Sequence, residues 1–194
     1  MSSIVVAGDT SGSVTLQAPA VSGSTVLTLP AVSGTVITNT AGVVTQAMLS
    51  TNVAGNGPAF SATLGSQSLT AGVWTLASLS TEEFDTNSNY NNTGSTVGGI
   101  PAYAFLPNIA GYYQFNGQMQ LNGSSSGIST QYSKNGSVFK QGTYIPTTLS
   151  TASVAVSALI YLNGTTDYVQ FYIYSGSTMT TNNAFFQAAM IRSA

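Results

Sequence analysis

Two segments, residues 105–115 and 161–171, constrain the fold of this chain more than any other feature. In each of them aromatic and β-branched residues alternate with small polar ones, and a glycine lies at the break. A period of two places alternate side chains on opposite faces of a strand, which is the pattern of a half-buried antiparallel sheet. The sequence therefore predicts that strands bury these aromatic rings.

Strand-like runs follow one another from Phe60 to the C-terminus, and no segment there has a sustained helical period. Asn-Gly pairs at 122–123, 135–136 and 163–164 lie between these runs, and Asn-Gly supplies the positive φ angles of tight hairpins. So many short strands predict an all-β knob over residues 59–194, an antiparallel two-sheet jelly-roll sandwich. The predicted strands are 60–64, 72–79, 102–106, 111–121, 128–134, 137–143, 153–162, 167–174 and 184–192.

Residues 1–45 differ from the knob because they contain no aromatic residue and one charged residue, Asp9. Such a stretch cannot bury enough apolar surface to offset its ordering entropy. We therefore expect an extended, β-rich docking arm that is ordered by pairing with sister arms or a neighbouring protein; a flexible low-complexity tail is the alternative. Residues 46–58 are the expected joint. The arm residues expected to dock are Val14, Leu16, Val26, Leu27, Leu29, Val36 and Ile37.

Composition excludes several classes of function. Charged residues make up 4% of the chain, against about 25% in an ordinary soluble domain. Three basic residues, Lys134, Lys140 and Arg192, cannot form a phosphate-binding patch, so we expect no nucleic-acid partner. The longest apolar run, 154–162, is too short to span a bilayer, so we expect no membrane insertion. The lack of cysteine fits folding in a reducing host cytoplasm.

Motifs across the knob resemble a known family. The chain has Phe-x-Pro-x-x-x-Gly-x-Tyr-x-Phe at 105–115, Phe-Asp-x-x-x-x-Tyr at 84–90, Lys-Asn-Gly at 134–136 and a closing aromatic strand at 185–191. Through them the knob resembles the globular head of the complement-component and tumour-necrosis-factor (TNF) superfamily. The resemblance implies a TNF-like jelly roll that works as a homotrimer in assembly and recognition. Ala188, where the family has glycine, is one departure.

The arm carries a second, shorter resemblance. Its pattern is similar to the Gly-x-Val-x-Leu-x-x-Pro, Leu-x-Leu-Pro and Gly-Thr-Val stretches of bacteriophage structural proteins, which are decoration or fibre proteins. This resemblance implies a place in a virion. The matching residues are Gly12, Val14, Leu16, Pro19, Leu27, Leu29, Pro30, Gly34, Thr35 and Val36.

The chain lacks the usual groups of an active site. Without histidine or cysteine it cannot build a Ser-His-Asp triad or a Cys-His dyad, and we expect no enzyme. Glu82, Glu83 and Asp85 are close enough in sequence for glycoside hydrolysis to be weighed, but a solvated loop is the favoured interpretation. No cofactor is expected; calcium, on Glu83 and Asp85, is the one candidate.

Adjacent aromatic residues predict a subunit interface. In Tyr112-Tyr113 and Phe171-Tyr172 one ring of each pair must face the core and the other must face outward. The family resemblance implies that outward rings bury against a neighbouring subunit, where tyrosine is well suited. The interface candidates are Tyr112, Tyr113, Phe171, Tyr172 and Phe186.

Three functions are weighed. The leading hypothesis is a trimeric capsid decoration (cement) protein or short head fibre on the virion surface, whose arm binds the major capsid protein or another virion protein. The alternative is the receptor-binding tip of a tail fibre, an adhesin whose loops bind a host glycan or protein. The third, a depolymerase, is disfavoured for want of catalytic groups.

Overall fold

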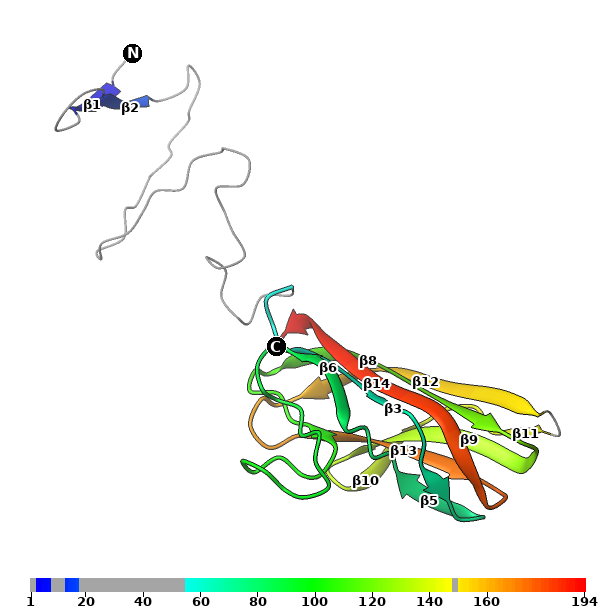
Figure 1. Ribbon diagram of the computed structural model, residues 1–194. Coiled ribbons are helices and arrows are strands. Elements are labelled where there is room, and N and C mark those ends of the chain that lie inside the picture. Colours follow the sequence, from blue (N-terminus) through cyan, green and yellow to red (C-terminus); the bar gives the residue numbers. More distant parts are fainter. Residues whose placement is uncertain (1–2, 8–12, 18–54, 148–149) are drawn as a thin grey trace. The chain divides into compact units, whose positions relative to one another are not determined.

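The computed structural model describes residues 3–7, 13–17, 55–147 and 150–194, which Figure 1 draws in colour. The chain divides into two units, Met1–Val43 and Val44–Ala194. The described part contains no helix long and apolar enough to cross a membrane.

The described residues of the first unit, 3–7 and 13–17, form a pair of strands. β1 (Ser3–Ala7) and β2 (Ser13–Gln17) are antiparallel and in register from Ser3 opposite Gln17 to Ala7 opposite Ser13. Strand β2 includes the expected docking residues Val14 and Leu16, and its partner belongs to the same chain, whereas we expected arm strands to pair with another chain. The remaining expected docking residues, Val26, Leu27, Leu29, Val36 and Ile37, lie outside the described residues.

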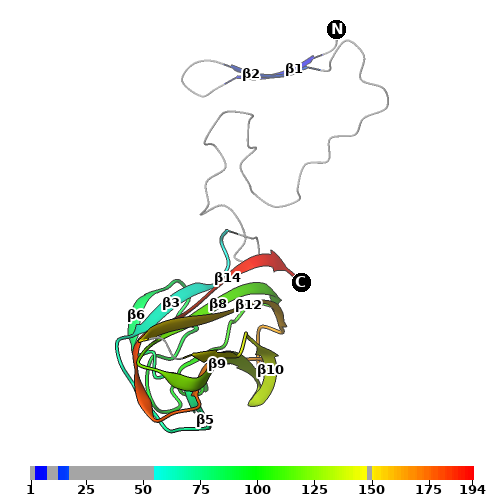
Figure 2. The same ribbon diagram turned by 90° about the vertical axis from the view of Figure 1, so that its right-hand side faces the viewer.

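The second unit is an antiparallel two-sheet jelly roll, and Figure 2 shows its sheets as two layers. The first layer, here called the β8 sheet, has the order β12-β8-β14-β3-β6, and β4 pairs with β14. Its strands are β3 (Ala59–Leu64), β4 (Ser68–Leu69), β6 (Thr81–Asp85), β8 (Gly111–Asn122), β12 (Thr151–Leu162) and β14 (Met179–Ser193).

The second layer, the β9 sheet, has the order β10-β9-β13-β5, with β11 paired to β9 and β7 paired to β13. Its strands are β5 (Val73–Leu76), β7 (Ala104–Phe105), β9 (Ser125–Lys134), β10 (Ser137–Gln141), β11 (Ile145–Thr147) and β13 (Val169–Ser175). The long strands alternate between the layers, since β8 and β12 belong to one sheet and β9 and β13 to the other.

This alternation corrects the expectation of three tight hairpins. Only Asn135-Gly136 closes a hairpin, between β9 and β10, with φ angles of 53° and 79°. Gly123 and Gly164 also have positive φ, 113° and 74°, but they connect strands of different sheets. An Asn-Gly pair indicates that the chain turns back, and it does not specify which sheet the next strand joins.

A cluster of aromatic rings fills the space between the layers. Phe186 lies at its centre, with its ring centroid 5.7 Å from those of Phe115, Tyr132 and Phe171 and 4.9 Å from that of Phe60. These rings come from both sheets, so their packing is what holds the sandwich together. The family motif at 105–115 is part of this core, because the three aromatic residues that define it, Phe105, Tyr113 and Phe115, are fully buried.

Gly117 makes room for this cluster. It lies opposite Phe186 in the β8–β14 pairing, and a Cβ atom at this position would lie 2.7 Å from Cε2 of Phe171. Glycine is therefore required here by the aromatic packing.

The segment with the three carboxylates is a strand, not the loop that we expected. β6 forms the edge of the β8 sheet, and Glu82 and Glu83 are exposed on it. Charged side chains on an edge strand discourage pairing with another chain. The sequence signal was weak here, because charged residues are typical of loops as well.

Candidate assembly surface

The outer face of the β8 sheet is lined by amides and hydroxyls. Along β8 the inward residues are aromatic or aliphatic, whereas Gln114, Asn116 and Gln118 point outward. Nε2 of Gln114 donates to Oγ of Ser157 at 2.8 Å, and this hydroxyl donates to Oδ1 of Asn116 at 2.9 Å. The side chains on this face are thus fixed by neutral hydrogen bonds across β8 and β12.

One end of this face is apolar. Tyr112, Leu159 and Tyr161 are 39%, 51% and 42% exposed, and the rings of Tyr112 and Tyr161 lie 5.4 Å apart. Phe139 of β10 shares a neighbour with Tyr161, since Nζ of Lys134 is 5.9 Å from the ring centroids of both residues. We call Tyr112, Phe139, Leu159 and Tyr161 the apolar edge. Its side chains come from both sheets, on the side of the sandwich where β10 approaches β12.

An ion pair supports the apolar edge. Nζ of Lys134 lies 2.9 Å from Oδ2 of Asp167 and donates to the carbonyl of Tyr161 at 2.7 Å. Nδ2 of Asn135 donates to Oδ1 of Asp167 at 2.7 Å, and the amide of Asn163 donates to Oδ2 at 3.2 Å. The pair therefore links the β9–β10 hairpin to the β12–β13 connection.

These contacts set the pKa of Asp167. Partial burial alone would raise this pKa, but the hydrogen bonds of Asn135, Lys134 and Asn163 and the charge of Lys134 outweigh the burial. The pKa of the carboxyl group is consequently lowered from its ordinary value, so the charged form is favoured in the folded protein.

The structure separates the five predicted interface residues. Tyr112 is exposed on the β8 sheet and Tyr172 is half-buried on the β9 sheet, so the prediction that one ring of each pair faces outward is confirmed. Tyr113, Phe171 and Phe186 are fully buried in the core of a single subunit and cannot contact another one, so these three candidates are wrong.

Sequence reasoning missed Leu159 and Tyr161 as exposed apolar residues. In the structure the side chains of β12 alternate between the two faces of the sheet. Val154, Val156 and Ile160 are buried, which places the odd-numbered residues of this strand on the outer face. The outward residues Ala155, Leu159 and Tyr161 are themselves apolar, so the run 154–162 shows little alternation in the sequence.

The two calcium candidates have hydrogen-bond partners in the protein. Both carboxylate oxygens of Asp85 accept backbone amides of their own turn, from Asn87 at 3.2 Å and from Tyr90 at 2.7 Å. Oε2 of Glu83 accepts the hydroxyl of Ser61 at 2.6 Å. The described residues contain no group of three or more acidic side chains that could hold a metal ion. Asp85 instead shapes the turn that carries Tyr90 into the core, where its ring stacks on Phe60.

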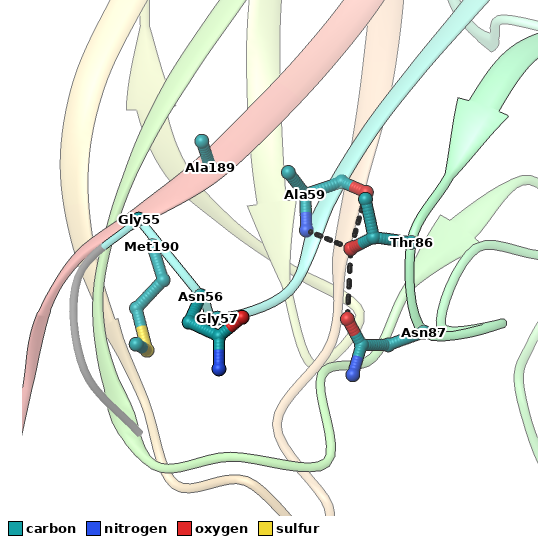
Figure 3. Close-up of a pocket in the computed structure, with 8 residues that line it drawn as sticks. All are labelled: Gly55, Asn56, Gly57, Ala59, Thr86, Asn87, Ala189 and Met190. Carbon is teal, nitrogen blue, oxygen red and sulfur yellow. Dashed lines mark hydrogen bonds between the residues drawn. The ribbon is translucent and has the colours of Figure 1, made fainter. Parts of the chain in front are cut away.

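A pocket of about 360 Å³ lies where the chain enters the knob (Figure 3). Its lining residues include Gly57, Thr86, Asn87 and Met190, and none of them is charged. Oγ1 of Thr86 accepts the amide of Ala59 at 3.0 Å and lies 2.7 Å from Oδ1 of Asn87. The hydroxyl group of Thr86 thus takes part in hydrogen bonds within the knob, and we interpret the pocket as part of the packing around the start of β3.

The sequence matches no protein-family model, and no curated protein sequence is similar to it. Solved structures do match the knob. The match to the globular domain of zebrafish complement 1qA protein spans 71% of this chain and 99% of that domain's chain, with 16% sequence identity and a TM-score of 0.53. The match to the PRD1 vertex protein P5 spans 70% of this chain and 73% of the P5 chain, with 20% sequence identity and a TM-score of 0.52. The match to murine APRIL spans 69% of this chain and 98% of the APRIL chain, with 10% sequence identity and a TM-score of 0.51.

These matches establish the fold. The predicted all-β, TNF-like jelly roll is confirmed, since complement and TNF-type heads and the PRD1 vertex protein share it. The predicted resemblance of the knob to this superfamily is confirmed with it, and the PRD1 match adds a similarity to a phage protein. The phage-like pattern of the arm stays a prediction.

Proposed function

We propose that this protein is a bacteriophage virion structural protein that assembles as a homotrimer, with the knob projecting from the particle and the arm anchoring it. The observation that carries the proposal is the common fold of the knob and a phage vertex protein, over most of both chains. Within that setting we assign the protein as a capsid decoration protein or a short head fibre.

The surface of the knob supports self-assembly. The apolar edge is an exposed hydrophobic patch rimmed by amides and hydroxyls, which is typical of a protein–protein interface. It lies to one side of the amide-lined face, so an edge-to-face contact between two copies would join different surfaces. Such a heterologous contact forms a ring when the rotation between copies closes, and a ring of three is what the resemblance to the TNF superfamily implies.

The oligomeric state of the full chain tests this part of the proposal. Sedimentation equilibrium should give a mass of three chains, since the apolar edge would be buried in the assembly. A mass that matches one chain at micromolar concentration would refute the trimer.

Location on the particle separates the two virion roles. We expect antibody to the knob, with gold as the label, to mark the whole head of intact particles. Gold confined to the tail tip would instead favour the receptor-binding tip, for which the exposed tyrosines, amides and hydroxyls of the knob are suitable contacts. Particles without gold on either structure would refute both roles.

A further inference from the structure

The outer face of the β9 sheet carries a row of aromatic rings. Trp74 of β5 lies opposite Tyr174 of β13, and their ring centroids are 5.1 Å apart with an interplanar angle of 42°. Tyr144, in the segment between β10 and β11, continues the row at 6.1 Å from Tyr174 and an angle of 47°. We call these three residues the aromatic platform. None of the rings is buried in the core, since Trp74 and Tyr174 are half-buried and Tyr144 is 51% exposed.

Tyr144 is held in place by the backbone of β9. Its hydroxyl group donates to the carbonyl of Ser126 at 3.3 Å. A Cβ atom on Gly127 would overlap this hydroxyl group, so the tyrosine can lie over the strand only because residue 127 is glycine. Gly127 does not have a positive φ, so its backbone geometry does not demand glycine. The platform is therefore preorganised, which lowers the entropic cost of binding a ligand.

The polar groups among the rings are neutral. Ser129 lies opposite Tyr174, and Gln131 lies opposite Tyr172 in the β9–β13 pairing. Both residues are buried beneath the rings, and the hydroxyl group of Ser129 makes no hydrogen bond there, so these two side chains add no charge under the platform. The charged side chains of the described residues lie elsewhere, on β6, on β14, in the Lys134–Asp167 pair and at Lys140 of the irregular β10 strand.

This combination favours one class of ligand. The C–H bonds of a pyranose ring pack against the electron-rich face of an aromatic ring, while sugar hydroxyls hydrogen-bond to amides and hydroxyls. A strongly charged ligand would find no counter-charge here, whereas the O–H groups of the tyrosines and the N–H group of the tryptophan can hydrogen-bond to sugar hydroxyls.

We propose that the aromatic platform binds a neutral saccharide chain, with sugar rings stacked on Trp74, Tyr174 and Tyr144. The platform lies on the outer face of the β9 sheet, whereas the face lined by amides and hydroxyls is the outer face of the β8 sheet. Self-assembly through the β8 sheet therefore leaves the platform accessible. The inference does not depend on the virion role or on the number of subunits.

Trp74 provides a direct readout, because it is the single tryptophan of the chain. The full-length protein is titrated with neutral oligosaccharides, namely maltotetraose, cellotetraose and the tetramer of N-acetylglucosamine, while tryptophan emission is recorded. At least one of them should change the emission saturably. No saturable change with any of the three up to millimolar concentrations overturns the proposal.

Gly127→Ala is the decisive variant. The added methyl group should displace Tyr144 without removing any aromatic ring, and we expect affinity for the bound saccharide to fall at least tenfold. Tyr174→Ala should give a similar loss. Phe84→Ser is the matched control, because Phe84 is 50% exposed, as Tyr144 is, but lies on the other sheet. The saccharide affinity of this variant should equal that of the wild type.

Three outcomes of this series contradict the proposal. Unchanged affinity in both Gly127→Ala and Tyr174→Ala places the bound sugar elsewhere. Loss of affinity in Phe84→Ser as well indicates a global effect of substitution, which thermal unfolding of each variant would also reveal. A change from trimer to monomer in Gly127→Ala, measured by sedimentation, makes the platform a contact between copies of this chain.

Discussion

At the scale of single residues, the stability of the knob depends on pH through Asp167. Its pKa is lowered in the folded protein, so its stabilising contribution is complete above the ordinary pKa of an aspartate, which is 3.8. The contribution is lost as the pH falls through the lowered folded value. Few other charges are present to obscure this dependence.

Asp167→Asn should destabilise the knob at neutral pH by about 1–3 kcal/mol, because hydrogen bonds to a charged group are lost and Lys134 is left unpaired. Thermal unfolding followed by circular dichroism between pH 7 and pH 2 measures the effect. The difference between variant and wild type should shrink toward acidic pH. A difference that is constant over this range would contradict the assignment.

The centre of the aromatic core gives a second residue-scale prediction. Phe186→Ala should lower the free energy of unfolding by about 3–5 kcal/mol, because it opens a cavity where four rings meet. Phe84→Ser, at an exposed edge position, should change it by about 0.5 kcal/mol or less. Urea unfolding of the two variants should therefore give well-separated midpoints, and coincident midpoints would count against the described core.

At the scale of secondary-structure elements, the long strands could be predicted and their partners could not. The two-residue period identified β8 and β13, because each buries every second side chain. β4 and β11 are too short to show a period, and β6 has the composition of a loop. The sheet that a strand joins depends on contacts between distant residues, so the Asn-Gly pairs at 122–123 and 163–164 were misread as hairpins.

The same limit explains the errors at the candidate interface. Alternation along β8 and β13 showed that one of two neighbouring rings is buried, but not which one. Phe171 is buried because its ring packs on Tyr132 and Phe186 from other strands. The platform residues Trp74 and Tyr144 are far apart in sequence, and only the pairing of β5 and β13 and the contact of Tyr144 with Tyr174 bring them together.

The outer face of β12 gives the element-scale prediction. Leu159→Asp and Tyr161→Asp each place a charge in the apolar edge, which would be costly to bury against another subunit. Both variants should sediment as monomers and keep the circular dichroism spectrum of the wild type. Val97→Asp, at a similarly exposed position in the loop before β7, should remain trimeric; trimers of all three variants would exclude this edge from the interface.

At the scale of the whole molecule, the two units are expected to have separable roles. Deletion of residues 1–45 should leave a folded knob, because the core described above lies entirely between residues 60 and 190. The truncated protein should fail to join particles if the arm is the anchor. Quantitative blotting of purified particles measures incorporation, and thermal unfolding verifies the fold; incorporation at the wild-type level would contradict the anchoring role.

The pairing of β3 with β14 has a practical consequence. Ala59, at the start of β3, lies opposite Ala189, and the amide of Ala194 donates to the carbonyl of Ala110, so the chain enters and leaves the knob at the same end (Figure 1). The connection at Gly123 and Ser124 lies at the opposite end of the 12-residue strand β8. For peptide display, a sequence fused after Ala194 would emerge at the end of the knob where β3 begins, whereas one inserted at this connection would be presented at the opposite end.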